Sequence, residues 1–165
     1  MKPVVAVSNE QREGVVSILN TLLSDEYLLC TKTRSYRWNV SGLHSNDLHK
    51  LFAGHHEQLE QLVDEVAQRT RSLGGFAFGT MTEFVRHTRL KEHPQEQPDA
   101  RHMVRNLLAD HESLVRLLRA DRQTCDEKFP DGPTNHFLTG LMERHEKMTW
   151  MFRAFLRAFF EDEPA

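Results

Sequence analysis

The sequence predicts an all-α protein: a four-helix bundle with a long crossover that carries a short extra helix. Apolar residues recur with 3-4 spacing along four long segments, and no segment shows the alternation of a half-buried strand. A proline-containing linker, residues 93–100, separates the second long segment from the third. The length of 165 residues allows one ample core, so we expect a single domain over residues 1–165 with a short N-terminal tail, residues 1–8.

The first expected helix runs from Asn9 to Arg37. Ser8 followed by Gln11 has the pattern of a capping box, in which two side chains satisfy backbone donors at a helix start. Apolar side chains then fall on one face of the segment: Val15, Ile18, Leu19, Leu22 and Leu29.

The second expected helix lies between His44 and Gly75, with Ser45 as its N-cap and the Gly74-Gly75 pair as its stop signal. Its apolar stripe contains Leu48, Leu51, Phe52, Leu59, Leu62, Val63 and Val66. A second line of residues runs beside this stripe and carries imidazoles and carboxylates: His49, Ala53, His56, Glu60, Asp64 and Ala67. We expect the chemistry of the protein on this second line.

The remaining segments complete the bundle. On the crossover, a short helix capped by Thr80 or Thr82 is expected. Pro98 suits the first turn of a third long helix that ends near Cys125. Thr134 is the expected cap of the fourth long helix.

Composition restricts the function classes. The 21 Lys and Arg residues against 24 Asp and Glu give no general case for nucleic-acid binding, whereas ten histidines supply many potential metal ligands. Cys30 and Cys125 share no metal-binding spacing and do not indicate a disulfide framework, which favours a reduced, cytoplasmic compartment. No apolar run is long enough for a signal peptide or a membrane span.

Helix length separates two of the candidate ligands. His49 and Asp64 lie about 22 Å apart along a helix axis at about 1.5 Å per residue, so one chain cannot bring both to one metal. A second copy lying antiparallel across a two-fold axis near residues 56 and 57 could place its Asp64 beside this His49. The two copies of His56 would then approach each other.

Three stretches resemble the Dps family, the small ferritins of starved or oxidatively stressed prokaryotes. They are KTRSYRWNVSG (32–42), DLHKLFAGHHEQLEQLVDEVAQRTRSLGG (47–75) and TNHFLTGLMERHEKMTWMFRAFL (134–156). The resemblance covers roughly residues 10–162 and implies a ferritin-like bundle. It further implies a dodecameric shell that oxidises Fe(II) with peroxide or oxygen, stores ferric mineral, and holds iron across a two-fold interface.

The resemblance also implies five iron ligands, and three of their positions are substituted here. A first-helix histidine is replaced by Arg37, an acidic residue by Ala53 and a glutamate by Gln68, while His49 and Asp64 are kept. Iron would lose two carboxylates and meet a fixed positive charge, so we expect Arg37 beside Asp64 to form a charge-assisted pair.

The kept and neighbouring residues have two interpretations each. His49 and Asp64 are either remnant metal ligands or members of an interfacial hydrogen-bond network with Arg37 and Gln68. His56 and its symmetry mate, with or without Glu60, either bind zinc or another borderline metal or lie in a wet polar interface.

Three further histidines are expected to be structural. His55 falls in the middle of the apolar stripe, where a core histidine with one hydrogen-bonded nitrogen is favoured over a ligand. His111 and His145, on the third and fourth long helices, are interpreted as bundle or subunit contacts.

Other family features are carried over by position. Trp38 matches the tryptophan beside the family's iron site, with a packed interfacial aromatic as the alternative. Asp126, Glu127 and Asp131 lie where the family has an acidic three-fold pore, with a solvated acidic turn as the alternative. His136 stands where relatives often carry another acidic residue.

Relatives that coat DNA commonly use a lysine-rich tail. Residues 1–13 here carry Lys2 and Arg12 against Glu10 and Glu13, so the tail is neutral and does not favour DNA binding. A basic surface assembled from arginines elsewhere stays open as an alternative.

Two functions are therefore predicted. The first is a Dps-like shell for iron binding, storage and protection against oxidative stress, with an atypical metal site between subunits. The alternative is a ferroxidase-inactive shell with a structural, metal-buffering (for example zinc) or DNA- or partner-binding role. For the chemistry, the three substitutions favour the second function, whereas the intact helix framework favours the first for the fold. The broad assignment is iron storage and detoxification, with ferroxidase turnover left open.

Overall fold

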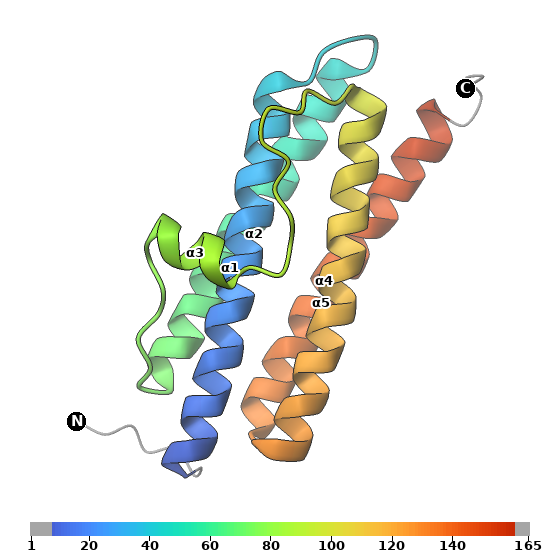
Figure 1. The fold of residues 1–165 in the computed structure, drawn as a ribbon. Coiled ribbons are helices and arrows are strands. Elements are labelled where there is room, and N and C mark those ends of the chain that lie inside the picture. The colour runs from blue at the N-terminus through green and yellow to red at the C-terminus, as the bar shows by residue number, and fades with distance from the viewer. Residues whose placement is uncertain (1–7, 161–165) are drawn as a thin grey trace.

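The computed structural model describes residues 8–160, a range that contains five helices and no strand (Figure 1). The four long helices and the short crossover helix are α1 (Asn9–Asn39), α2 (Ser45–Ser72), α3 (Met81–His87), α4 (Ala100–Lys128) and α5 (Gly132–Phe159). The predicted all-α bundle with a short helix on the crossover is confirmed.

The long helices form two antiparallel hairpins, α1 with α2 and α4 with α5, and the hairpins pack against each other (Figure 1). The crossover leaves the end of α2, places α3 against the outer side of α1, and then runs along the bundle to the start of α4. None of the described helices combines the length and the apolar character that a membrane span requires.

Three predicted helix signals are confirmed at the helix ends. Ser8 Oγ accepts the backbone N–H of Gln11 at 3.2 Å, and the Gln11 side chain accepts the backbone N–H of Ser8 at 3.0 Å. After α2 ends, Gly74 has a φ of 79°, a left-handed conformation that glycine adopts without strain. Thr80 forms a second capping box at the start of α3.

Two other predicted helix starts are wrong by one or two residues. Ser45 is already helical, and the N-cap is His44, which makes no side-chain cap hydrogen bond. Pro98 precedes α4 rather than entering its first turn, because Asp99 takes the N-cap and its carboxylate accepts a backbone N–H. The third long helix also continues past Cys125 to Lys128.

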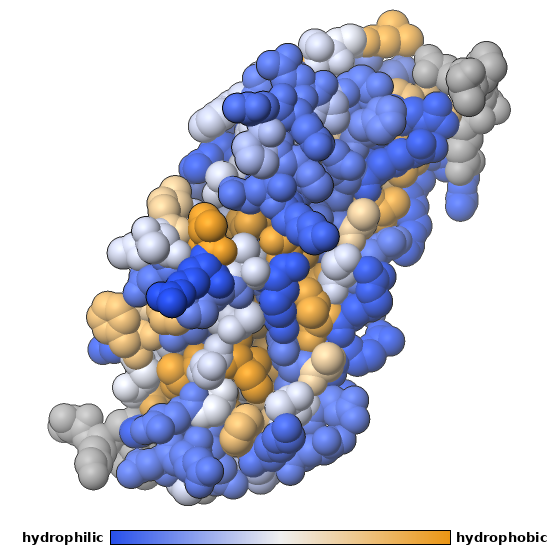
Figure 2. Space-filling view, viewed as in Figure 1, coloured by the Kyte–Doolittle hydropathy of each residue, from blue (hydrophilic) through white to orange (hydrophobic). Residues whose placement is uncertain are grey.

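The core lies between the two hairpins. Phe52 of α2 and Phe152 of α5 are its largest fully buried side chains, with ring centroids 6.3 Å apart. The outer surface is mostly hydrophilic, but apolar residues reach it around α3 (Figure 2). We call Phe76, Met81 and Val85, each more than half exposed, the α3 patch.

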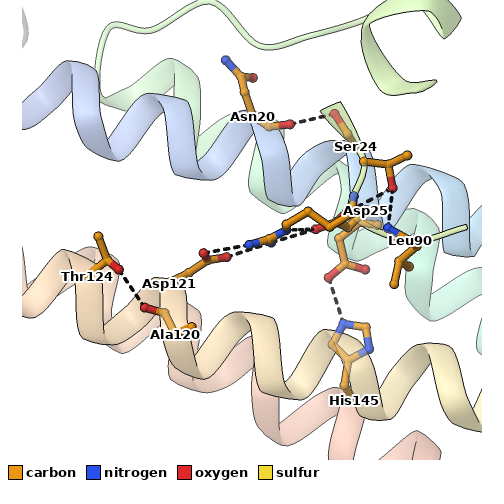
Figure 3. A network of polar contacts seen from close by, with 11 residues as sticks. Asn20, Ser24, Asp25, Leu90, Ala120, Asp121, Thr124 and His145 are labelled. Carbon is orange, nitrogen blue, oxygen red and sulfur yellow. Dashed lines mark hydrogen bonds and ion pairs between the residues drawn. The ribbon is translucent and has the colours of Figure 1, made fainter. Parts of the chain in front are cut away.

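A buried ion-pair network fastens the crossover to both hairpins (Figure 3). Asp25 of α1 has no solvent exposure, and its carboxylate accepts the backbone N–H of Arg89 at 2.6 Å and the Arg89 Nε–H at 2.8 Å. The same guanidinium donates to both carboxylate oxygens of Asp121 on α4, each at 2.8 Å. Burial raises the pKa of Asp25 above its usual range although Arg89 opposes the shift, so the stability of this charge depends on Arg89.

Replacing Arg89 by Met should therefore leave the Asp25 carboxylate buried without its cation. We expect Arg89→Met to lower the free energy of unfolding by about 3 kcal/mol, the order measured when one partner of a buried pair is removed. Urea denaturation measures the loss. Arg86→Met, at an exposed position on α3, is the control and should change stability by less than about 0.5 kcal/mol. Equal effects of the two substitutions would contradict the role of this network.

Candidate functional site

The exposed side of the α1–α2 hairpin carries the residues that the sequence singled out, and we call it the hairpin face. A shallow pocket there is lined by Tyr27, Cys30, Thr31, Arg34, Glu60, Val63 and Asp64. Burial raises the pKa of the Cys30 thiol to about 12, so this cysteine stays protonated and is a poor metal ligand.

His56 is buried against this face in the single chain. Its Nε2 lies 3.7 Å from Glu60 Oε1 and has no hydrogen-bond partner. Burial is the main cause that lowers the pKa of His56, and Arg34 and Arg37 lower it further against the attraction of Glu60. At neutral pH the ring therefore has a lone pair available on this face.

The expected pair between Arg37 and Asp64 is wrong within one chain. Arg37 Nε has no hydrogen-bond partner, and no ion pair joins the two residues in the described structure. The hairpin register explains the absence, because the pocket places Asp64 with Cys30 and Arg34 of α1, whereas Arg37 lies further toward the end of that helix.

The other predicted site residues stay apart in one chain. His49, Asp64 and Gln68 are exposed on α2, Ala53 is half-buried, and Trp38 at the end of α1 has 68% of its surface exposed. Within residues 8–160, no three His, Cys, Asp or Glu side chains are already grouped to hold a metal ion. The interfacial metal site therefore stays a prediction that requires a second chain.

The acidic turn before α5 is partly neutralised. Asp131 is buried, serves as the N-cap of α5 in place of the predicted Thr134, and pairs with Arg69 of α2 at 2.6 Å. Asp126 and Glu127 are exposed, and each accepts a hydrogen bond from a neighbouring amide side chain. Two of the three predicted pore residues thus face solvent, while Asp131 holds α5 to α2.

The centre of the bundle contains a polar cluster that the sequence analysis did not recognise as a unit. Each long helix contributes one side chain, and all four are at most 1% exposed: Glu26 (α1), His55 (α2), His111 (α4) and His145 (α5). We call this set the bundle-centre cluster. His145 lies beside the ion-pair network described above (Figure 3).

Hydrogen bonds join three members of the cluster in a chain. Glu26 Oε1 lies 2.8 Å from His145 Nε2, and His145 Nδ1 lies 2.8 Å from His111 Nδ1. Because a carboxylate can only accept, His145 donates its Nε2–H to Glu26. When each ring carries one proton, His145 Nδ1 is therefore an acceptor, and His111 donates its Nδ1–H to it. His111 Nε2 and Glu26 Oε2 then have no partner.

The expectations for these histidines are met in part. His111 and His145 are contacts within the bundle, as predicted, and His55 lies in the core. The expected hydrogen bond of His55 is wrong, because neither of its ring nitrogens has a partner. Its ring instead packs edge-on against Phe152, with centroids 4.5 Å apart.

Burial governs the charge state of two of these rings. It lowers the pKa of His55 to about 4 and that of His111 well below its usual range, and the nearby His145 lowers both further. These two imidazoles are therefore neutral near pH 7.

Comparison with known proteins defines the class of this fold. A family model described as a ferritin-like domain matches residues 16–159, and the chain belongs to that family. Among solved structures, DpsC from Streptomyces coelicolor superposes with a TM-score of 0.90 at 25% identity, covering 100% of this chain and 94% of that one. A Dps protein from Bacillus brevis superposes with a TM-score of 0.84 at 28% identity, covering 90% and 99%.

Sequence relatives place the chain more narrowly. It is 44% identical over 97% of its length to an uncharacterized low temperature-induced protein of Nostoc sp. strain PCC 7120, covering 87% of that protein. It is 29% identical over 86% of its length to DNA protection during starvation protein 2 of Bacillus anthracis, covering 96% of that protein. Within the ferritin-like proteins, the chain is a member of the Dps family.

Acid should destabilise the protein through the buried imidazoles. Because the folded pKa of His55 is about 4 and its unfolded value about 6.5, the unfolded state binds protons first, and stability is lost as the pH falls between these values. The loss from His55 is on the order of 3 kcal/mol. In EDTA-containing buffer, the thermal midpoint of His55→Leu should therefore fall less between about pH 7 and about pH 5 than that of the unsubstituted protein.

The matched control for this measurement is His136→Leu, which removes an exposed histidine from α5. The thermal midpoint of this control should fall with pH as much as that of the unsubstituted protein. The same loss of thermal midpoint in all three proteins would contradict a neutral His55.

Proposed function

We propose that this chain assembles into a Dps-type shell that binds and stores iron and protects against oxidative stress. The hairpin face is the observation that most supports this function. Its two kept ligand positions, His49 and Asp64, are exposed on one helix and about 22 Å apart along its axis. A second copy lying antiparallel across a two-fold axis supplies the missing half of each site.

The α3 patch supports pairing through this face. Tyr27 lines the pocket that contains Asp64, and its ring stacks on Phe84 of α3 with centroids 4.1 Å apart. Tyr27 therefore connects the pocket with α3, the helix that carries Met81 and Val85 of the α3 patch. Contiguous exposed apolar residues beside polar groups are typical of protein–protein interfaces, and self-pairing would remove them from water.

The donor set explains what such a paired site does with iron. His49 of one copy and Asp64 of the other offer an imidazole and a carboxylate, both of which bind Fe(II). Ala53 and Gln68 remove two further carboxylates, and Arg37 adds positive charge. We infer that the shell retains iron binding and storage, and that oxidation at this interface is slow.

A second candidate function is a ferroxidase-inactive shell that buffers a borderline metal such as zinc or binds DNA or a partner. The observation that favours metal buffering is the unpartnered Nε2 of His56 beside Glu60. Two copies of His56 near a two-fold axis would offer two imidazoles to one ion.

Anaerobic Fe(II) titration followed by peroxide addition tests the first function. The protein should bind Fe(II), and ferric absorbance should rise faster after peroxide addition than it does in buffer. The double variant His49→Ala/Asp64→Ala should lose this gain, because both kept ligands are removed. Oxidation at the buffer rate in the unsubstituted protein would favour the second candidate.

Restoring the three substituted positions should increase the oxidation rate. Arg37→His, Ala53→Asp and Gln68→Glu together remove a positive charge and add two carboxylates, so we expect a gain of at least about tenfold, the order of effect that site residues have on a metal centre. Stopped-flow ferric absorbance measures it.

The control for this gain makes the same chemical changes at exposed positions away from the hairpin face: Arg122→His, Ala120→Asp and Gln97→Glu. It should leave the rate unchanged. An intact shell that shows no gain in the restored variant would contradict the assignment of the three positions.

A further inference from the structure

The bundle-centre cluster contains more ligand groups than its hydrogen bonds use. His55 has two unpartnered ring nitrogens, His111 has one, and Glu26 has an unpartnered carboxylate oxygen, all at positions no more than 1% exposed. A buried polar group without a partner costs about 1–3 kcal/mol. Unpartnered polar atoms on side chains from three of the four long helices, gathered in one buried cluster, indicate a missing ligand.

We propose that the bundle-centre cluster is a binding site for one borderline divalent cation such as Zn²⁺, with His55, His111 and His145 as ligands and Glu26 as the residue that orients His145. Metal sites in helical bundles are built in this way, from inward side chains on facing helices. This site lies inside one chain and is independent of the proposed iron site between subunits.

The spacing of the three rings suits a shared ion. Two imidazoles bound to one tetrahedral ion through nitrogens at about 2.0–2.1 Å have ring centroids about 5 Å apart. The centroids of His111 and His145 lie 5.0 Å apart, and those of His55 and His111 lie 6.2 Å apart. Both printed separations are close to the spacing that a shared ion requires, and the larger one needs the His55 ring to move toward His111.

The donor chemistry favours a borderline cation over a hard one. Three imidazoles suit Zn²⁺, Co²⁺ and similar ions, whereas hard cations prefer oxygen ligands. The pKa of His55, about 4, leaves its lone pair free near pH 7. The lowered pKa of His111 keeps that ring neutral, so its single proton can move from Nδ1 to Nε2 and leave Nδ1 for the ion. The carboxylate of Glu26 on His145 Nε2 repeats the carboxylate–histidine–metal arrangement that fixes a ligating ring.

One hydrogen bond must open to admit the ion. The Nδ1 atoms of His111 and His145 lie 2.8 Å apart, whereas two nitrogens on one tetrahedral ion lie about 3.3 Å apart. The ion takes the place of the shared proton, which moves to Nε2 of His111, so the net charge of the two rings does not change. Within residues 8–160, no three His, Cys, Asp or Glu side chains already surround a common point, and this hydrogen bond has to break before the cluster can do so.

Cobalt binding tests the site without recourse to activity. We would use the full chain with the hairpin-face donors removed, as the background variant His49→Ala/His56→Ala/Asp64→Ala. After chelator treatment, Co²⁺ titration should give one ion per chain with the intense visible absorption of a tetrahedral site. Absence of this spectrum in a folded background protein would overturn the proposal.

Removal of one ligand localises the binding. His55→Leu in the same background should weaken Co²⁺ binding at least about tenfold, whereas the control His136→Leu should not change it. Zn²⁺ should raise the thermal midpoint of the background protein but not that of the His55→Leu variant, since a ligand that binds only the folded state stabilises it. Equal binding by both variants would overturn the site.

A second readout applies if the His55→Leu chain does not fold. In the background variant with His55 intact, Zn²⁺ should shift the ¹⁵N NMR resonances of the three buried imidazoles. It should leave those of exposed histidines such as His136 unchanged. Shifts confined to exposed histidines would overturn the proposal. Because the background lacks the hairpin-face donors, neither result depends on whether the proposed iron function is correct.

Discussion

Two adjacent buried carboxylates on α1 connect the separate parts of the bundle. Asp25 binds Arg89 of the crossover, which in turn binds Asp121 of α4. Glu26, the next residue, binds His145 of α5, which in turn contacts His111 of α4. Apolar packing is non-directional, so it leaves the relative position of two hairpins loosely specified. These directional contacts fix one arrangement, since a shift between hairpins would leave buried charges unpaired.

The same two residues explain how a bundle core can contain a functional cluster. Both carboxylates have no solvent exposure, and the rings of His55 and His111 pack against Phe152. Burial keeps His55 and His111 neutral, which makes them unfavourable core residues in acid but good donors near neutral pH. The loss of stability expected in acid and the proposed metal binding thus have one physical cause.

Much of the fold could be predicted because helix periodicity is a local signal. The four long helices and the short helix follow from 3-4 spacing and from capping boxes at Ser8 and Thr80. The errors at Ser45, Pro98 and Thr134 arise because several residues compete for each cap, and the choice depends on the backbone of the preceding turn. The expected pair of Arg37 with Asp64 does not form within one chain, because the register between two helices is not a local property of the sequence.

The bundle-centre cluster could have been suspected from sequence but not assembled. His111 follows the buried Leu107 by four residues and precedes Leu114 by three, and His145 stands in the same relation to Leu141 and Met148. Such positions place a polar residue on the apolar stripe of its helix, which is an informative signal. The four residues lie close together only because of the way the two hairpins align along the bundle. This alignment is seen in the structure and cannot be read from the sequence.

The central claim is that the hairpin face pairs with a second copy of itself in a closed shell. Native mass spectrometry of the purified full chain measures this most directly, together with the position of cross-links formed across the assembly. We expect a mass of twelve chains, with cross-links joining the α2 helices of neighbouring subunits around His56. A monomeric mass, or a stable assembly in which the hairpin face stays open to solvent, would contradict it.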